Sequence, residues 1–389
     1  MMTCKMKRKF LLLICTVFLL GTAACHSTET SSQEDSTTTI NSSLSSSTAS
    51  SSNNESQVQH IKKELDTNLL VDADVILPAK KAYSTYTMVN QSFTSEELSQ
   101  LFLNPDDKVQ ILPNTNGTDA LNIESSNGST IVANNTGIYY KKSDRDSTID
   151  TILNEYYTKH KNDIAENKDL SFLSRADAIK QGADFLRSLH LSCEPADEPT
   201  VIALTADELN AFQSELLKDD NYRNFPKTKV IENWTKQDDV YQLRFTFEKD
   251  GIPVYGSAQE PNIVMHYDDP YCPLGMYARM TITSEGIRYL NVMSAYSLSG
   301  QPSDPQTIIS VDDVLNALKK SYSDVILSKP HTVKKIFLEY IAKQDPDTTY
   351  QNARYSLIPY WCLEIDDGDI LLTAERFNAL TGKDLAYGG

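Results

Sequence analysis

A loop in the second half of the chain carries side chains that could bind a metal ion. His266, Asp268 and Cys272 bring an imidazole, a carboxylate and a thiol together within seven residues, and these groups are ligands of Zn²⁺ in proteins. A metal held here would support a metal-dependent envelope hydrolase. Pro270 and Pro273, however, are typical of a turn-rich loop, in which Asp and Tyr are common for conformational reasons. We therefore favour a turn and keep the metal site as the alternative.

A second acidic sequence, Asp366-Asp367-Gly368-Asp369, could bind Ca²⁺ through its carboxylates. It lacks the twelve-residue spacing and the terminal Glu of an EF-hand loop. Asp and Gly in this order, between two apolar runs, are typical of a β-turn whose acidic tip is solvated. We predict a turn at this position.

Short motifs of the known catalytic classes are missing from the sequence. It contains no Gly-x-Ser-x-Gly, Ser-x-x-Lys, His-Glu-x-x-His or Cys-x-x-Cys motif, and no Gly-rich loop for phosphate. The six histidines are scattered along the chain. We therefore predict no catalytic residue and no cofactor, and we expect the protein to act by binding.

Tyrosines gather around the loop that carries the metal candidates. The chain has twenty Tyr, and Tyr255, Tyr267, Tyr271 and Tyr277 lie close together in sequence. A tyrosine combines a large contact area with a polar tip, which suits a recognition surface. These four residues are our candidates for a partner-binding surface. The more ordinary interpretation, which we rank above it, is that they cover the edges of a sheet.

The first twenty-five residues indicate where these groups would work. Basic residues at 5–9 precede an apolar run at 10–20, and small residues at 21–24 precede Cys25. This is the pattern of a secretory signal, and the run is shorter than the ~20 residues that span a bilayer. The end of the signal resembles the lipobox of bacterial lipoproteins, with Thr22 where Leu is usual. The resemblance implies that Cys25 is diacylated and becomes the mature N-terminus. An ordinary secretory signal with an incidental Cys is the alternative.

The segment after the signal is rich in small polar residues. Ser and Thr make up nineteen of the thirty residues 27–56. Such a segment buries too little apolar area to offset its ordering entropy. We therefore predict a flexible tether at 25–57 with a root-mean-square reach of roughly 30 Å. Together with the signal at 1–24, it predicts a lipid-anchored protein on the extracytoplasmic face of the cell membrane.

Charge and cysteine content restrict the partners further. The formal net charge is −17, and a surface this acidic repels nucleic acid and anionic lipid headgroups. Membrane attachment must then come from acyl chains. Beyond the signal and Cys25, the cysteines are Cys193, Cys272 and Cys362. Their odd number and wide spacing predict separate thiols instead of a disulfide framework, with one bridge between two of them left open.

Hydrophobic patterns predict a mixed α+β fold. Capping sequences place helix starts at Thr94, Ser174, Thr205 and Ser310. A further helix near 147–161 and a short one at 58–65 are also expected. Alternation of apolar and polar residues predicts strands at 66–78, 240–248, 332–343 and 357–365. We expect residues 83–89 to pair with the first of these, and the strand at 240–248 to have one buried and one solvated face.

The order of these elements suggests a domain organisation. Residues 58–170 are predicted to form an N-terminal α+β domain. A helix followed by antiparallel strands then occurs twice, in a unit at 171–301 and in a second unit at 302–389. The two units share the order of their elements and not their residues, so they are expected to be related in layout.

Three short phrases carry a family resemblance. Residues 249–254, 357–361 and 378–383 resemble the strand and turn signatures of PepSY-type units and of the extracytoplasmic domains of YycH/YycI-like regulators. The layout of 58–389 is also similar to a group of uncharacterised clostridial lipoproteins. The resemblance implies a helix packed on an antiparallel sheet and no catalytic residue. PepSY-type units are linked to restraint of proteases, and YycH/YycI proteins to control of a membrane sensor kinase. This chain carries a lipobox in place of their membrane anchor.

The sequence therefore favours a lipid-anchored, non-enzymatic protein that recognises a protein or peptide in the cell envelope. A metal-dependent envelope hydrolase is the first alternative. A solute-binding lipoprotein of a transporter is a further one, ranked lower because such proteins usually alternate strands and helices in a parallel sheet. The predicted strands here are joined by tight turns instead.

Overall fold

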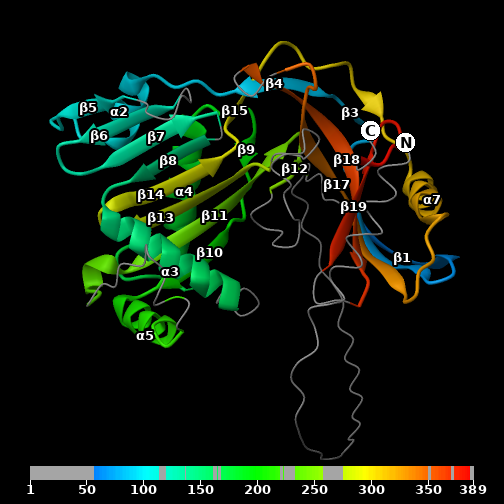
Figure 1. Ribbon diagram of the computed structural model, residues 1–389, viewed down its shortest axis with the longest axis horizontal. Helices are drawn as coiled ribbons and strands as arrows, with labels where there is room; N and C mark the ends of the chain where they lie inside the picture. The colour runs from blue at the N-terminus through cyan, green and yellow to red at the C-terminus, as the bar shows by residue number, and fades with distance from the viewer. Residues whose placement is uncertain are drawn as a thin grey trace, which may run out of the picture. The chain divides into compact units, whose positions relative to one another are not determined.

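The computed structural model shows a mixed α+β fold (Figure 1). It describes residues 57–113, 120–135, 137–160, 164, 168–219, 222, 233–256, 275–348, 352–368 and 372–385. Within these residues lie a large, mostly antiparallel sheet and five α-helices. The predicted α+β class is confirmed at this level. No helix in the described ranges is long and apolar enough to cross a membrane.

One part of the sheet is antiparallel throughout. Its strands follow one another, in spatial order, as β5 (Val109–Leu112), β6 (Leu121–Ser125), β7 (Thr130–Asn134), β8 (Gly137–Lys141), β14 (Gly286–Met293), β13 (Tyr277–Thr283), β11 (Val240–Lys249) and β10 (Thr200–Leu204). The β8–β14 pairing brings together two segments that are about 150 residues apart in the chain.

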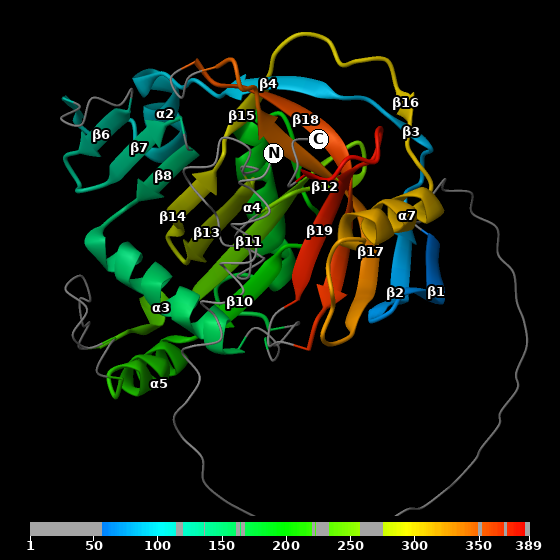
Figure 2. The ribbon, with the colours of Figure 1, turned by 45° about the vertical axis from the view of Figure 1, so that its right-hand side comes forward.

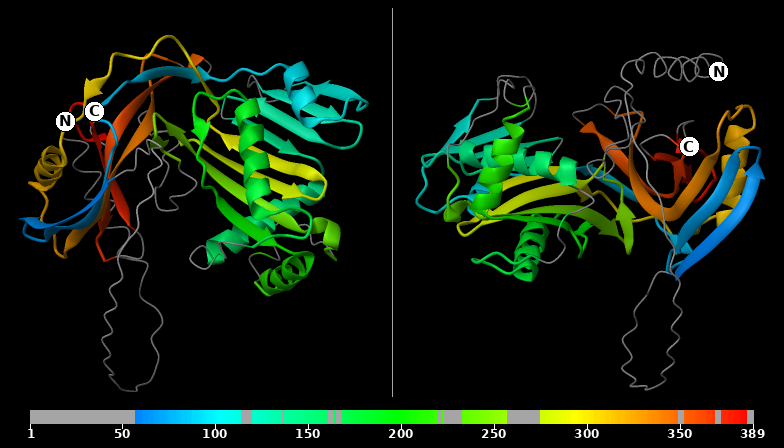
Figure 3. Two further views of the ribbon diagram at one scale, coloured as in Figure 1. Left: turned by 180° about the vertical axis from the view of Figure 1, so that it is seen from behind. Right: turned by 90° about the horizontal axis from the view of Figure 1, so that it is seen from below.

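Helices cover both faces of this part. Successive side chains of a strand point to opposite faces, so Leu243 and Gln242 of β11 face different helices. Leu243 lies against Gly182 of α4 (Arg175–Ser188), where an added Cβ would come within 2.7 Å of the Leu243 side chain. Gln242 faces Asp150 of α3 (Asp144–His160). Figures 1 and 3 show α3 in front of the strands from one side and α4 in front from the other.

This arrangement corrects the prediction for the strand at 240–248. Gln242 is fully buried and Arg244 is 9% exposed, so neither face of β11 is open to solvent. The polar residues of the strand meet the polar face of α3 instead. The apolar face of α3, with Ile149, Ile152 and Leu153, packs on α5 (Ala206–Leu216).

The other part of the sheet joins the two ends of the described chain. Its strands are β1 (Gln57–Asp66), β2 (Leu69–Leu77), β17 (His331–Gln344), β18 (Arg354–Asp366), β19 (Thr373–Asn378), β4 (Tyr86–Asn90) and β15 (Tyr296–Leu298). The β2–β17 pairing is parallel, and β17–β18, β18–β19 and β18–β4 are antiparallel. Helix α7 (Val311–Tyr322) covers one face, with contacts to β1 and β19 (Figure 2).

Several short elements complete the fold. They are β3 (Ala82–Tyr83), paired with β16 (Gln306–Thr307); β9 (Glu194–Pro195) and β12 (Ile252–Val254), both paired with the end of β11; helix α2 (Ser95–Phe102); and the 3₁₀ turn η1 (Lys236–Asp238). Strand β12 also pairs with β17 at Tyr340.

Two tyrosines from the other part of the sheet hold the turn between β11 and β12. Asp250 occupies the turn with a positive φ of 54°. Its carboxylate accepts hydrogen bonds from the hydroxyls of Tyr86 (2.5 Å) and Tyr340 (3.3 Å), and Tyr340 also donates to the carbonyl of Ser84 (2.8 Å). Burial, followed by the hydrogen bond and charge of Asp250, raises the pKa of Tyr86. One carboxylate therefore fixes the end of a hairpin to β4 and β17.

Local signals in the sequence agree well with the helices and long strands. Thr94, Ser174, Thr205 and Ser310 are N-caps whose side chains accept a hydrogen bond from the helix backbone. The predicted strands at 66–78, 332–343 and 357–365 correspond to β2, β17 and β18. These predictions are confirmed.

Two predictions near the start of the fold are wrong. Residues 58–65 form strand β1 and not a helix. Val58, Ile61 and Leu65 have helix-like spacing, but antiparallel pairing with β2 determines the conformation. Residues 83–89 do not pair with β2, because β2 lies between β1 and β17. Strand β4 pairs with β15 and β18 instead.

Strand pairing also connects the three predicted segments of the chain. The β8–β14 pair joins residues from 58–170 and 171–301, and the β2–β17 pair joins residues from 58–170 and 302–389. The order of helix followed by antiparallel strands occurs from α4 onward and again from α7 onward. The boundaries at 170 and 301 stay predictions.

Candidate functional site

Most of the side chains singled out in the sequence lie outside the described residues. This applies to Cys25, to the tyrosines Tyr267 and Tyr271, and to the metal candidates His266, Asp268 and Cys272. In the described ranges, no group of three or more His, Cys, Asp or Glu side chains could hold a metal ion. The lipid site and the metal alternative therefore remain predictions.

Two of the four candidate tyrosines can be placed. Tyr255 is 2% exposed and packs with Ile341 and Tyr360, and the guanidinium of Arg376 lies 4.7 Å from its ring centroid. Tyr255 is therefore a core residue and cannot contribute to an accessible binding surface. Tyr277 is half-buried at the start of β13, opposite Thr246 and Met293.

Cys193 and Cys362 are both buried, and in the described part of the chain no disulfide joins them. Burial raises the pKa of the Cys193 thiol to about 11. A thiol with so high a pKa is almost entirely protonated at neutral pH and reacts slowly as a nucleophile. Cys193 is therefore an unreactive core residue.

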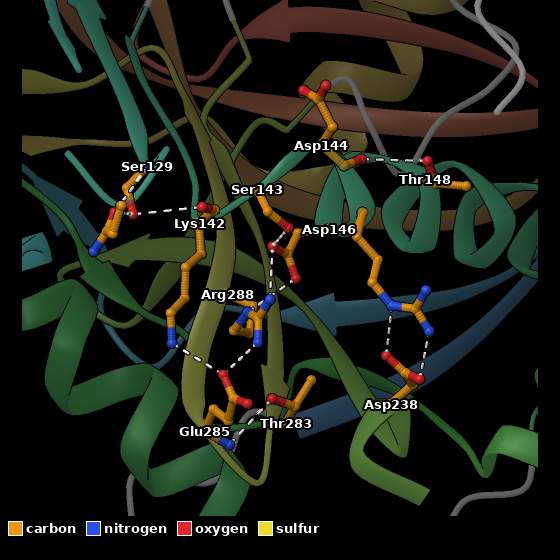
Figure 4. A network of polar contacts seen from close by, with 12 residues as sticks. Ser129, Lys142, Ser143, Asp144, Asp146, Thr148, Asp238, Thr283, Glu285 and Arg288 are labelled. Carbon is orange, nitrogen blue, oxygen red and sulfur yellow. Dashed lines mark hydrogen bonds and ion pairs between the residues drawn. The ribbon is translucent and has the colours of Figure 1, made fainter. Parts of the chain in front are cut away.

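A network of charged groups fixes the start of α3 to the sheet (Figure 4). The guanidinium of Arg288 lies 3.0 Å from the carboxylate of Asp146, which is 2% exposed, and also pairs with Glu285. Glu285 in turn accepts from Lys142 at 3.0 Å. The hydrogen bond from Lys142, followed by the charge of Arg288, lowers the pKa of Glu285.

The network continues deeper under α3. The guanidinium of Arg279 donates two hydrogen bonds of 2.8 Å to the carboxylate of Asp150, to which Gln242 also donates at 3.1 Å. Arg244 donates to Gln242 and Asn154, and its guanidinium carbon lies 3.9 Å from the ring centroid of Tyr157. Burial, followed by the charge of Arg279, lowers the pKa of Arg244 to about 10.

These buried groups bond to one another and leave little capacity for a ligand. Burial alone would lower the pKa of Arg279, but the charge of Asp150 and the neighbouring tyrosines outweigh it, so the pKa is raised. Such an arrangement positions α3 on the sheet and fixes one packing geometry. We therefore interpret the network as structural.

A cleft at the junction of the two parts of the sheet is a better candidate for the functional site. It encloses about 510 Å³, which is within the range of about 300–1,000 Å³ for ligand pockets. It is formed by the end of β4 and the connection to α2, by β6 and the end of β7, and by the start of β18. The lining residues are Val89, Asn90, Gln91, Ser92, Phe93, Leu121, Ala133, Asn134, Asn135, Asn352, Ala353 and Arg354.

The chemistry of this lining is unusual for the chain. Five of the twelve residues carry carboxamides, and Arg354 is the one charged residue among them. None of the described residues that line the cleft carries a carboxylate, although Asp and Glu number 53 in the sequence. The Oδ1 atom of Asn90 is buried without a hydrogen-bond partner in the described structure. A buried acceptor of this kind gains from a donor supplied by a bound molecule.

The sequence alone does not indicate this cleft. Its residues come from positions near 90, 121–135 and 352–354, which only the sheet pairing brings together. Residues 104–137 are rich in Asn, Gly and Ser, a composition typical of loops and short hairpins. The neighbouring amides of Asn90 and Gln91, and of Asn134 and Asn135, are the signal that could have suggested a polar recognition site.

The comparisons with known proteins give the fold a precedent. No protein-family model matches the chain, and no curated protein matches it. The crystal structure of an uncharacterised protein from Eubacterium rectale is similar, with a TM-score of 0.52 and 14% sequence identity. The match covers 85% of this chain and 96% of that protein. At this identity the likeness shows a shared fold alone.

Proposed function

We propose that the protein is a lipid-anchored, extracytoplasmic binding protein that recognises a protein or peptide of the cell envelope through the carboxamide-lined cleft. The observation that carries the proposal is the composition of the cleft. Among the described residues, its lining combines five carboxamides and one guanidinium with apolar side chains and no carboxylate.

Carboxamides are well suited to a peptide ligand. Each has a donor and an acceptor in one plane, as a peptide group does, so the two can form paired hydrogen bonds. The apolar lining residues, Val89, Phe93 and Leu121 among them, provide contacts for side chains between those hydrogen bonds. Seven of the twelve described lining residues are polar, so the cleft is more polar than the mostly apolar pockets common for small ligands, as suits a ligand held mainly by hydrogen bonds. The arrangement favours recognition over catalysis.

We further propose where the protein lies in the cell and which kind of unit its helix-and-strand segments form. Acylation of Cys25 would hold the protein at the membrane, and the tether at 25–57 would let the cleft reach neighbouring envelope proteins. The segments from α4 and from α7 onward would be PepSY- or YycI-like units. The order of helix and antiparallel strands in both segments supports this assignment.

The proposal is tested with fluorescent pools of random octapeptides and the purified full-length protein in detergent. We expect saturable binding measured by anisotropy, and a loss of affinity in Asn352→Ala, which shortens one carboxamide of the cleft. Asn210→Ala, a carboxamide that bonds to Trp234 outside the cleft, is a control for general loss of fold. Absence of peptide binding, or binding only to an oligosaccharide array, would contradict the proposal.

A further inference from the structure

We infer that the ligand of the cleft presents a carboxylate and that Arg354 is the residue that binds it. The inference rests on the proposed function, and it adds the chemical class of the ligand group. The charge of the cleft contrasts with the charge of the chain. The protein carries a net charge of −17, whereas the described lining of the cleft carries one positive charge.

Arg354 differs from most of the other arginines in its pairing. Arg354 is exposed, and within the described residues no carboxylate forms an ion pair with it. By contrast, five described arginines pair with Asp or Glu: Arg145, Arg187, Arg279, Arg288 and Arg376. In a chain with such an excess of carboxylates, a cleft arginine that pairs with none of the described ones is available to an external anion.

The backbone around Arg354 is well fixed. Its N–H donates to the hydroxyl of Thr348 (3.3 Å), and its carbonyl accepts from the N–H of Asp345 (2.8 Å). The carboxylate of Asp345 accepts from the N–H of Asp347 at 3.3 Å and so belongs to its own turn. The guanidinium is therefore carried by an ordered strand end.

The pairing of β18 with β4 places Arg354 beside further cleft residues. Arg354 is directly opposite Val89 in the antiparallel register, and opposite residues have Cβ atoms about 4.5–5.5 Å apart. Asn352, two residues earlier, also lines the cleft. A ligand held by Arg354 would thus lie next to a carboxamide and an apolar side chain.

The amount of charge favours a carboxylate over a phosphate. A planar guanidinium binds a carboxylate through two parallel hydrogen bonds. One positive charge with neutral amides balances a single negative charge, whereas a phosphate ester carries about −1.5 to −2 at pH 7. Within a peptide, the carboxylate can come from the free C-terminus or from an Asp or Glu side chain.

Three fluorescent octapeptide pools separate these sources. The first has free C-termini, the second is C-terminally amidated, and the third is amidated and lacks Asp and Glu. Each is titrated against the full-length protein, Arg354→Ala, Arg354→Lys and Arg187→Ala. Arg187 is a surface residue on α4 that is 43% exposed, so its removal matches the change in net charge without touching the cleft.

We expect the third pool to bind wild-type protein on the order of 10- to 100-fold more weakly than the best carboxylate-bearing pool. Arg354→Ala should lose the same factor and bind all three pools alike, Arg354→Lys should recover part of it, and Arg187→Ala should behave as wild type. Equal binding of the three pools by wild-type protein, or an unchanged preference in Arg354→Ala, would overturn the inference and leave the proposed function standing. Failure of every pool to bind would remove both.

Discussion

Removing the carboxylate of Asp150 should destabilise the protein strongly. Its side chain is 6% exposed, and that of its partner Arg279 is 15% exposed. Asp150→Ala leaves the guanidinium of Arg279 buried without its counter-charge; among the described residues, the hydroxyl of Tyr289 at 3.3 Å is then its remaining hydrogen-bond partner. Two unit charges about 4 Å apart interact by about 4 kcal/mol at an effective dielectric constant of 20.

Mutational experience with buried pairs gives a similar magnitude. Loss of one partner of a buried ion pair costs about 3–5 kcal/mol, against a total stability of about 5–15 kcal/mol for a typical protein. We therefore expect the free energy of unfolding of Asp150→Ala to fall by about 3–5 kcal/mol, measured by urea denaturation followed by far-UV circular dichroism.

Two further variants make the test decisive. Asp184→Ala removes an exposed carboxylate paired with Lys180 on α4 and should leave the urea midpoint unchanged. Replacing both partners, in Asp150→Leu with Arg279→Met, should cost much less than Asp150→Ala because no buried charge is then left over. If Asp150→Ala and Asp184→Ala unfold at the same urea concentration, the interpretation of the network under α3 is refuted.

Three other predictions follow from the sequence and the described contacts. Cys25→Ala should move the protein from the membrane fraction to the medium and abolish a diacylglycerol adduct at residue 25 in mass spectra; unchanged fractionation would contradict lipidation. Burial opposes the ionisation of Asp238, but hydrogen bonds from Arg145 outweigh burial and lower the pKa of Asp238 below 3.8. Ionised Asp238 therefore stabilises the fold above pH 3.8. This stabilisation is lost as the pH falls through the pKa of Asp238 in the folded protein. The stability deficit of Asp238→Asn should therefore shrink between pH 5 and pH 3 in urea unfolding, and a constant deficit would argue against the pair. In the Cys272→Ser protein, Cys193 should react with a thiol reagent after unfolding in 6 M guanidinium and hardly at all in the native state. Peptide mass spectrometry measures the labelling of Cys193 in both states. Rapid labelling of the native protein would show that Cys193 is accessible.

Local chemistry explains which parts of the fold were predictable. An N-cap such as Thr94 or Ser310 acts on backbone groups within three residues, so its sequence signal does not depend on the rest of the molecule. Alternation in β2 and β18 likewise identified strands. In β11, however, alternation reported polarity and not exposure. Gln242 and Arg244 are buried because α3 offers matching polar groups, and that match cannot be seen in either segment alone.

The candidate site was less predictable because it depends on convergence. Asn90, Asn134 and Arg354 lie up to 264 residues apart in sequence, and each is unremarkable in its own neighbourhood. Tyr255 shows the opposite case. Its sequence neighbours suggested a recognition surface, but contacts from β17 and β18 bury it in the core.

The parallel pairing of β2 with β17 also determines when folding can be completed. Val71 of β2 lies opposite Val333 of β17, so some 260 residues must be synthesised before that edge of β2 gains its partner. Until then, β2 exposes an unpaired row of backbone groups beside apolar side chains, which is a template for association with other chains. Contacts between positions this distant also slow folding. A chain that ends before residue 331 should therefore aggregate instead of forming a smaller stable domain, and the nascent protein has a long interval in which a chaperone or a translocation channel can hold it unfolded.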